Sequence, residues 1–183
     1  MKPEERLNAG RLINRLGSRY LKWTAYGLVI LLTIILQSLP RFLPQLLSAK
    51  PLLIIPVVVC IAMFEGPVDG AAAGVCGGIL WDLFSDRLLG FNALILLILC
   101  CACGLMSQLL IRNNLLSTLM MTAATLFVQG ILSWFFYDLL LDFENSLTAL
   151  LYFTLPGIFY TLILTPPIYL AVYAVARILR NRE

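Results

Sequence analysis

Few residues of this 183-residue chain are of types that perform chemistry: five cysteines, ten acidic residues and no histidine. Cys100, Cys101 and Cys103 have the spacing of a metal clip, but no fourth ligand lies near them. All five cysteines fall inside apolar stretches, where a thiolate is costly and an oxidising compartment does not reach. We therefore interpret the cysteines as small packing residues, and expect no metal, no cofactor and no disulfide framework.

Asp82 is the acid with the most apolar surroundings in the sequence. It follows Gly78 by four residues and precedes Asp86 by four. An ionisable side chain in such surroundings is expected to face a polar partner or water, or to cap a turn. Paired carboxylates can act as acid and base, but no nucleophile, histidine or metal set accompanies them. We expect no catalytic residue and no enzyme. Four further acids are expected to be solvated: Asp69, Asp138, Asp142 and Glu144.

The composition indicates an all-α integral membrane protein. Hydrophobic residues make up 61% of the chain and charged residues 13%, against about 45–50% and 25% in soluble domains. The mean hydropathy of +0.92 would leave a soluble fold with apolar surface that it cannot cover. The net charge of +3 comes mainly from basic residues near the two ends, a pattern that favours a membrane surface and does not support nucleic-acid binding.

About six transmembrane helices are expected, forming one domain over residues 23–183. The second segment has only 13 residues, against about 20 needed to cross ~30 Å of hydrocarbon, so a re-entrant segment stays open there. The last is interrupted by Pro156-Gly157 and Pro166-Pro167, which predict a kinked or broken helix. The apolar segments are 23–39, 52–64, 66–84, 91–110, 115–140 and 150–178.

Basic residues set the expected orientation. With the N-terminus in the cytoplasm, ten Lys and Arg fall on the inside and only Arg41, Lys50 and Arg87 on the outside, which fits both termini inside and six crossings. Residues 1–22 alternate basic and apolar residues at helical spacing, which predicts an amphipathic helix on the membrane surface that binds anionic lipids. Its lipid-facing cations are expected to be Arg11, Arg15, Arg19 and Lys22.

Four glycines recur at four-residue intervals in the third segment: Gly66, Gly70, Gly74 and Gly78. In a membrane, such a ridge lets another helix backbone approach closely. The neighbour is expected to be another helix of this chain or a helix of a partner protein.

The run Glu65-Gly66-Pro67, the glycine-rich helix that leads to Asp82, and the later motif Gly90, Asn92, Ala93 and Leu94 resemble the rod shape-determining protein MreD family. The resemblance implies a multi-pass protein of the bacterial inner (cytoplasmic) membrane that binds MreC. It also implies an assembly with RodA, a class B penicillin-binding transpeptidase and the MreB cytoskeleton. The fold it implies resembles the substrate-binding subunits of energy-coupling-factor transporters.

Two functions follow as expectations. The first is a non-enzymatic scaffold subunit of the cell-elongation (rod) complex, which helps to organise peptidoglycan synthesis and cell shape. The second is a small-molecule, vitamin-type binding subunit of a membrane transporter. Such subunits usually carry an Ala-x-x-x-Ala pair in their first helix, whereas Ala25 is followed four residues later by Val29. The sequence therefore favours the scaffold.

Overall fold

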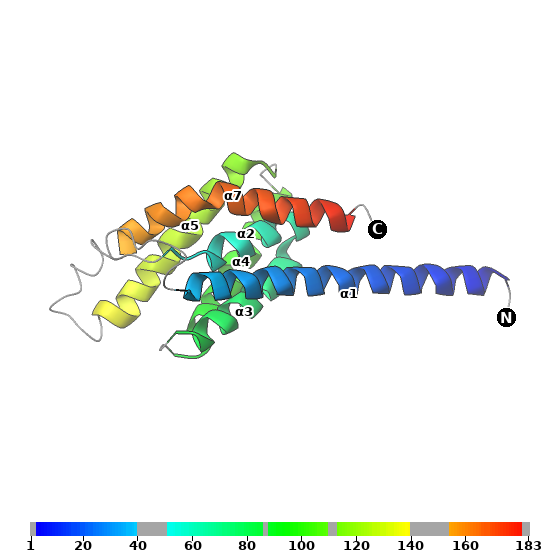
Figure 1. The fold of residues 1–183 in the computed structure, drawn as a ribbon, viewed down its shortest axis with the longest axis horizontal. Coiled ribbons are helices and arrows are strands. Elements are labelled where there is room, and N and C mark those ends of the chain that lie inside the picture. Colours follow the sequence, from blue (N-terminus) through cyan, green and yellow to red (C-terminus); the bar gives the residue numbers. More distant parts are fainter. Residues whose placement is uncertain (1–2, 40–50, 86–87, 110–112, 140–153, 181–183) are drawn as a thin grey trace.

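The computed structural model describes residues 3–39, 51–85, 88–109, 113–139 and 154–180, and for residues 3–19, 21, 138–139 and 179–180 it describes the backbone only. Every element in these ranges is helical (Figure 1). Arg41, Lys50, Arg87, Arg112, Asp142 and Glu144 lie outside the described residues. The helices are α1 (Pro3–Ser38), α2 (Ile54–Glu65), α3 (Pro67–Leu83), α4 (Phe91–Leu109), α5 (Leu115–Ser133), the π-helix η1 (Trp134–Leu139) and α7 (Leu155–Arg180).

The first four helices alternate in direction. Tyr26, in the middle of α1, bonds to Glu65 at the end of α2, while Gln37, near the end of α1, bonds to Ile54 at the start of α2. Helices α3 and α4 are likewise antiparallel, because Asp82 near the end of α3 bonds to Asn92 near the start of α4. We call the two ends of the bundle the Glu65 end and the Asp82 end.

Helices α5 and α7 continue this alternation. Gln129, in the last turns of α5, bonds to Asn92 at the Asp82 end. Tyr169 and Tyr173, in the second half of α7, pack against Phe64 at the Glu65 end with tilted rings. The chain therefore begins and finishes at the Glu65 end, and Figure 1 shows both termini on the same side of the bundle. The number of membrane crossings stays a prediction.

Helix α2 is the centre of the bundle. Residues Ile54 to Met63 are all buried, and the helix contacts α1, α3, α4, α5 and α7. Its 12 residues span only about 18 Å, less than the ~30 Å of hydrocarbon. A helix that is apolar on every side is stable when protein surrounds it. Its short length is therefore compatible with a place inside the bundle, away from lipid.

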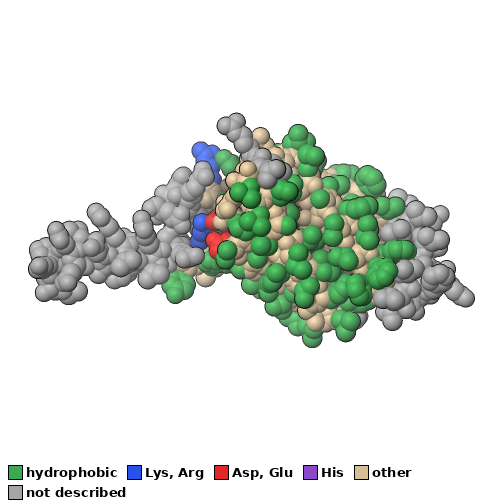
Figure 2. Space-filling model, turned by 180° about the vertical axis from the view of Figure 1, so that it is seen from behind, with side chains coloured by type: hydrophobic (Ala, Val, Ile, Leu, Met, Phe, Trp, Pro, Cys, Tyr) green, Lys and Arg blue, Asp and Glu red, His purple; other side chains and the backbone are tan. Residues whose placement is uncertain are grey.

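The outward surface is apolar, as a membrane environment requires. Among the residues that the structure describes, three helices are long and apolar enough to cross a bilayer, at Phe91–Leu109, Leu115–Tyr137 and Leu155–Ile178, while Lys22–Ser38 and Ile54–Glu65 are shorter apolar helices. Hydrophobic side chains are spread over the whole described face in Figure 2, and the charged side chains on that face gather at one end.

Two helices differ from the sequence expectations. Helix α1 runs without interruption from Pro3 to Ser38, so residues 1–22 and the first span are not separated by a break in the described backbone. Helix α7 is continuous through Pro166 and Pro167, so the helix is not broken at that pair, and the kink that the sequence analysis allowed as the alternative stays a prediction. The buried hydroxyls of Thr161 and Thr165 each donate to a carbonyl one turn earlier in the same helix, those of Gly157 and Thr161.

Candidate functional site

The glycine ridge of α3 lies against α4. A Cβ at Gly74 would stand 2.6 Å from the Leu96 carbonyl oxygen, and one at Gly78 would stand 2.6 Å from the Ala93 backbone nitrogen. Gly70 faces Ala62 of α2 and the backbone of Cys100 in the same close way. These distances leave no room for any side chain. The ridge is therefore occupied by helices of the same chain.

A glycine of α4 also allows close packing between α3 and α4. A Cβ at Gly104 of α4 would lie 2.6 Å from the Cα of Pro67 at the start of α3. Gly66 precedes Pro67 and has a φ of +99°, a conformation that residues with a Cβ rarely adopt. It allows the chain to leave α2 and enter α3 within one residue. Together these glycines let α3 and α4 pack backbone against backbone.

Asp82 closes the other end of the same helix pair. Its side chain is 2% exposed, and its Oδ2 accepts hydrogen bonds from the backbone N–H groups of Gly90, at 2.8 Å, and Ala93, at 3.4 Å. Its Oδ1 accepts from the Asn92 amide at 2.7 Å. Carboxylates near a helix N-terminus are stabilised by the free N–H groups there. Asp82 thus caps α4 from within α3, one of the roles that the sequence left open.

The donors to Asp82 come from the motif of Gly90, Asn92, Ala93 and Leu94. Gly90 has a φ of +94°, which turns its N–H toward the carboxylate. Asn92 is fully buried and Ala93 faces Gly78, whereas Leu94 is 61% exposed and points away from the bundle. Three of the four motif residues therefore form the contact between α3 and α4.

The sequence analysis did not identify Gln129 of α5, which bonds to Asn92 and so connects the hydrogen bonds around Asp82 to a third helix. The amide of Gln129 is fully buried and donates to Asn92 Oδ1 at 2.5 Å. Gln129 lies on the same face of α5 as three buried threonines, spaced four, three and four residues apart, which was a readable signal in an apolar span. Within the described part of the chain, Gln129 Oε1 and Thr122 Oγ1 have no hydrogen-bond partner. The polar face of α5 is Thr118, Thr122, Thr125 and Gln129.

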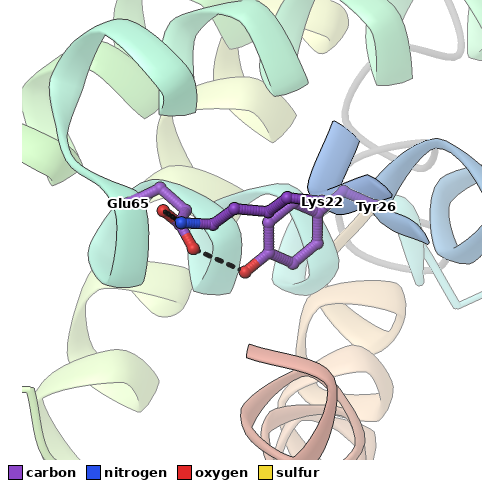
Figure 3. A network of polar contacts seen from close by, with 3 residues as sticks. All are labelled: Lys22, Tyr26 and Glu65. Atoms are coloured by element: carbon purple, nitrogen blue, oxygen red, sulfur yellow. Dashed lines mark hydrogen bonds and ion pairs between the residues drawn. The ribbon is translucent and has the colours of Figure 1, made fainter. Parts of the chain in front are cut away.

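A second polar cluster lies at the Glu65 end (Figure 3). Lys22 Nζ and Glu65 Oε2 form an ion pair at 2.5 Å, and the Tyr26 hydroxyl donates to Glu65 Oε1 at 2.6 Å. The two α1 side chains converge on the carboxylate at the end of α2. The sequence analysis expected Lys22 to contact lipid headgroups, whereas in the structure its ammonium group pairs with Glu65. The side chains of Arg11, Arg15 and Arg19 lie outside what the structure describes.

Both ends of the short helix α2 receive polar partners from its neighbours. The N–H of Leu52 donates to Thr161 Oγ1 at 2.9 Å, and the N–H of Ile54 donates to Gln37 Oε1 at 3.2 Å. At the other end, the Met63 carbonyl accepts from Ser107 and Asn113, each at 2.9 Å. Side chains thus satisfy backbone groups that lipid could not.

The asparagines before α5 do not cap it with their side chains. Asn114 is the N-cap residue of α5 but makes no side-chain cap bond. Asn113 is turned toward α2, where its amide donates to the Met63 carbonyl, and its side-chain oxygen lies close to the Ser107 hydroxyl.

Three of the five thiols are buried among other side chains, whereas Cys76 is exposed and Cys101 is half-buried. Cys60 and Cys100 lie in the apolar core, and Cys103 Sγ lies 3.5 Å from the Thr125 hydroxyl. No group of three or more cysteine, aspartate or glutamate side chains that could hold a metal ion occurs among the described residues. Each polar cluster described above joins helices, so the arrangement positions helices relative to one another.

The comparison with protein families agrees with this geometry. Residues 18–179 match the family described as rod shape-determining protein MreD, a range that contains the glycine ridge, Asp82 and the Lys22–Glu65 pair. Searches among curated proteins and among solved structures give no match. Because the family match covers nearly the whole chain, this protein belongs to the MreD family of rod shape-determining membrane proteins.

Proposed function

We propose that this protein is a non-catalytic scaffold subunit of the bacterial cell-elongation complex, which binds MreC and helps to organise peptidoglycan synthesis. The observation that carries the proposal is the state of Asp82. Both of its carboxylate oxygens are occupied by donors of the same chain. A general acid or base needs an oxygen free to reach a substrate, whereas a structural cap does not.

The proposed topology places the Glu65 end at the cytoplasmic face of the inner membrane. The basic first 22 residues and the C-terminus share that end, which agrees with the excess of Lys and Arg expected inside. Arg11, Arg15 and Arg19 would contact anionic lipid headgroups there. Residues 23–183 form the proposed single transmembrane domain, and no further domain is needed for the scaffold role.

The partner surface cannot be the glycine ridge, because α2 and α4 fill it. MreC, and the proposed neighbours RodA, the class B penicillin-binding transpeptidase and MreB, would therefore contact outward faces of the bundle or its two ends. The ridge would support these contacts indirectly, by fixing the positions of α3 and α4.

The experiment is complementation in a rod-shaped host depleted of the protein. Wild-type protein is expected to restore rods, and Asp82→Ala is expected to restore them in proportion to the amount that accumulates in the membrane. The matched control is Gly27→Ala, at a glycine with nothing within 4 Å, which should restore rods at the wild-type level. Normal accumulation of Asp82→Ala with round cells would show that Asp82 does more than hold the fold, and would reject the proposal.

A further inference from the structure

We propose that the contact between α4 and α5 binds a pair of internal water molecules, held by Gln129 Oε1 and Thr122 Oγ1. We call this contact the α4–α5 seam. Its polar residues are buried within the bundle: Asn92, Thr122 and Gln129 are 0% exposed, Thr125 is 1% exposed and Cys103 is 6% exposed.

Polar contacts join the two helices along the seam. The Gln129 amide of α5 donates to Asn92 of α4, and Cys103 Sγ of α4 lies 3.5 Å from Thr125 Oγ1 of α5. Buried polar side chains of folded proteins nearly always have hydrogen-bond partners. Within the described part of the chain, Gln129 Oε1 and Thr122 Oγ1 have none. Both atoms belong to the polar face of α5, so a ligand on that face would satisfy both.

The direction of the hydrogen bonds fixes what Gln129 needs. An ionised carboxylate only accepts, so Asn92 must turn its amide nitrogen to Asp82 and its Oδ1 to Gln129. Gln129 must then present its Nε2 to that oxygen, because a flip of either amide would bring two oxygens together. Gln129 Oε1 is therefore an acceptor that needs a donor from within the seam.

Thr122 differs from the threonines on either side of it. Thr118 and Thr125 each donate to a carbonyl of their own helix, those of Asn114 and Met121. A threonine inside a helix commonly makes this bond. Thr122 does not make it, so its hydroxyl hydrogen is available to a ligand.

Thr125 lies between these two residues and supplies a third contact. Its hydrogen goes to the Met121 carbonyl at 2.8 Å, so the Cys103 thiol donates to its oxygen, and one lone pair of that oxygen stays available. Thr122 and Gln129 lie three and four residues from Thr125, a spacing at which Cβ atoms on a helix face are about 5–6 Å apart. Two O–H···O hydrogen bonds of about 2.8 Å span that distance.

Water fits these requirements. One molecule donates one hydrogen to Gln129 Oε1 and its other hydrogen to Thr125 Oγ1. Its oxygen accepts from a second molecule, which itself accepts from the Thr122 hydroxyl. Buried water typically makes about three hydrogen bonds to groups that would otherwise be unpaired. Water also has no net charge, so it brings no desolvated ion into the core.

The test is hydroxyl-radical labelling of the full chain in lipid nanodiscs by a short X-ray pulse, which produces radicals from water, internal water included. Mass spectrometry then gives the extent of oxidation of each thiol. Cys103 contacts Thr125 in the seam, whereas Cys60 and Cys100 are 0% exposed in the apolar core. Cys76 is exposed on the outside of α3 and reports radicals that arrive through lipid. Cys103 is expected to be oxidised about fivefold more than each of these three thiols, because water lies beside it.

A matched pair of variants links this labelling to the seam. Thr122→Val replaces the hydroxyl by a methyl group of nearly the same size, and is expected to lower the oxidation of Cys103 toward that of Cys60. Thr122→Ser keeps the hydroxyl and is expected to leave the oxidation of Cys103 unchanged.

Equal oxidation of Cys103, Cys60 and Cys100 in the wild type would overturn the proposal, because no water would then lie in the seam. Oxidation of Cys76 at the level of Cys103 would also overturn it, because radicals from outside would then be the source. The wild-type comparison uses no variant, so it decides the matter even if Thr122→Val does not fold.

Discussion

The close contact between α3 and α4 makes a sharp prediction for Gly74→Ala. The added Cβ would lie 2.6 Å from the Leu96 carbonyl oxygen, 2.9 Å from the Leu96 carbonyl carbon and 3.2 Å from Cys100 Cβ. The two nearest atoms belong to the backbone, so no side-chain rotation relieves the contact. The helices must separate by several tenths of an ångström, and overpacking of this kind costs about 1–3 kcal/mol. Gly74→Leu adds three more carbons to the same space and should cost more.

Gly27→Ala is the matched control, because Gly27 is also helical but has nothing within 4 Å of its Cβ position. Alanine favours a helix over glycine by up to about 1 kcal/mol, so this variant should be unchanged or slightly more stable. The assay compares the temperatures at which the purified proteins lose their monodisperse peak in mild detergent. Gly74→Ala should lose it at a clearly lower temperature than Gly27→Ala. Equal temperatures for the two variants would refute the claim that backbone contact at Gly74 holds α3 to α4.

Three further predictions concern the polar contacts and the topology. Asp82→Asn replaces a charged acceptor and should destabilise the protein by roughly 1.5–3 kcal/mol. The double variant Asp82→Asn with Asn92→Asp again has one carboxylate in contact with one amide, so it should recover part of that stability. If the double variant shows no recovery in the thermal assay, Asp82 does not act as the cap of α4. Thr161→Val leaves the Leu52 N–H without an acceptor and should lower the free energy of unfolding by about 1–3 kcal/mol. Thr161→Ser keeps the hydroxyl and should lower it much less. Equal decreases for the two variants would show that this hydrogen bond does not contribute to stability. A cysteine at Asn114 should react with an impermeant thiol reagent only from the cytoplasmic face, and labelling of intact cells at that position would contradict the proposed orientation.

Features that depend on neighbours in the sequence could be predicted. The all-helical architecture, the boundaries of α3 and α4, and the tight turn at Gly66 follow from hydropathy and from the positions of glycine and proline, which act locally. The four-residue spacing of the glycines also predicted a close helix contact. It left open whether the neighbour belonged to this chain, because spacing describes one face and not what lies against it.

Features that depend on distant pairs could not be predicted. Gln129 meets Asn92 across 37 residues, and Tyr26 meets Glu65 across 39. Each of these residues alone has an ordinary alternative, such as a solvated or interfacial position, and only the fold selects the partner. Helix α7 shows the converse case, because the local rule for proline predicted a kinked or broken helix, and α7 continues through Pro166 and Pro167 without a break.

The most direct test of the scaffold proposal is affinity purification of the tagged full-length protein from its native membrane in mild detergent, followed by identification of the co-purifying proteins. The proposal predicts recovery of MreC in near-stoichiometric amount, with the Gly27→Ala variant behaving like the wild type and Gly74→Leu losing MreC together with its own accumulation. Recovery of a pair of ATPase subunits in place of MreC would contradict the scaffold role and indicate a transporter subunit.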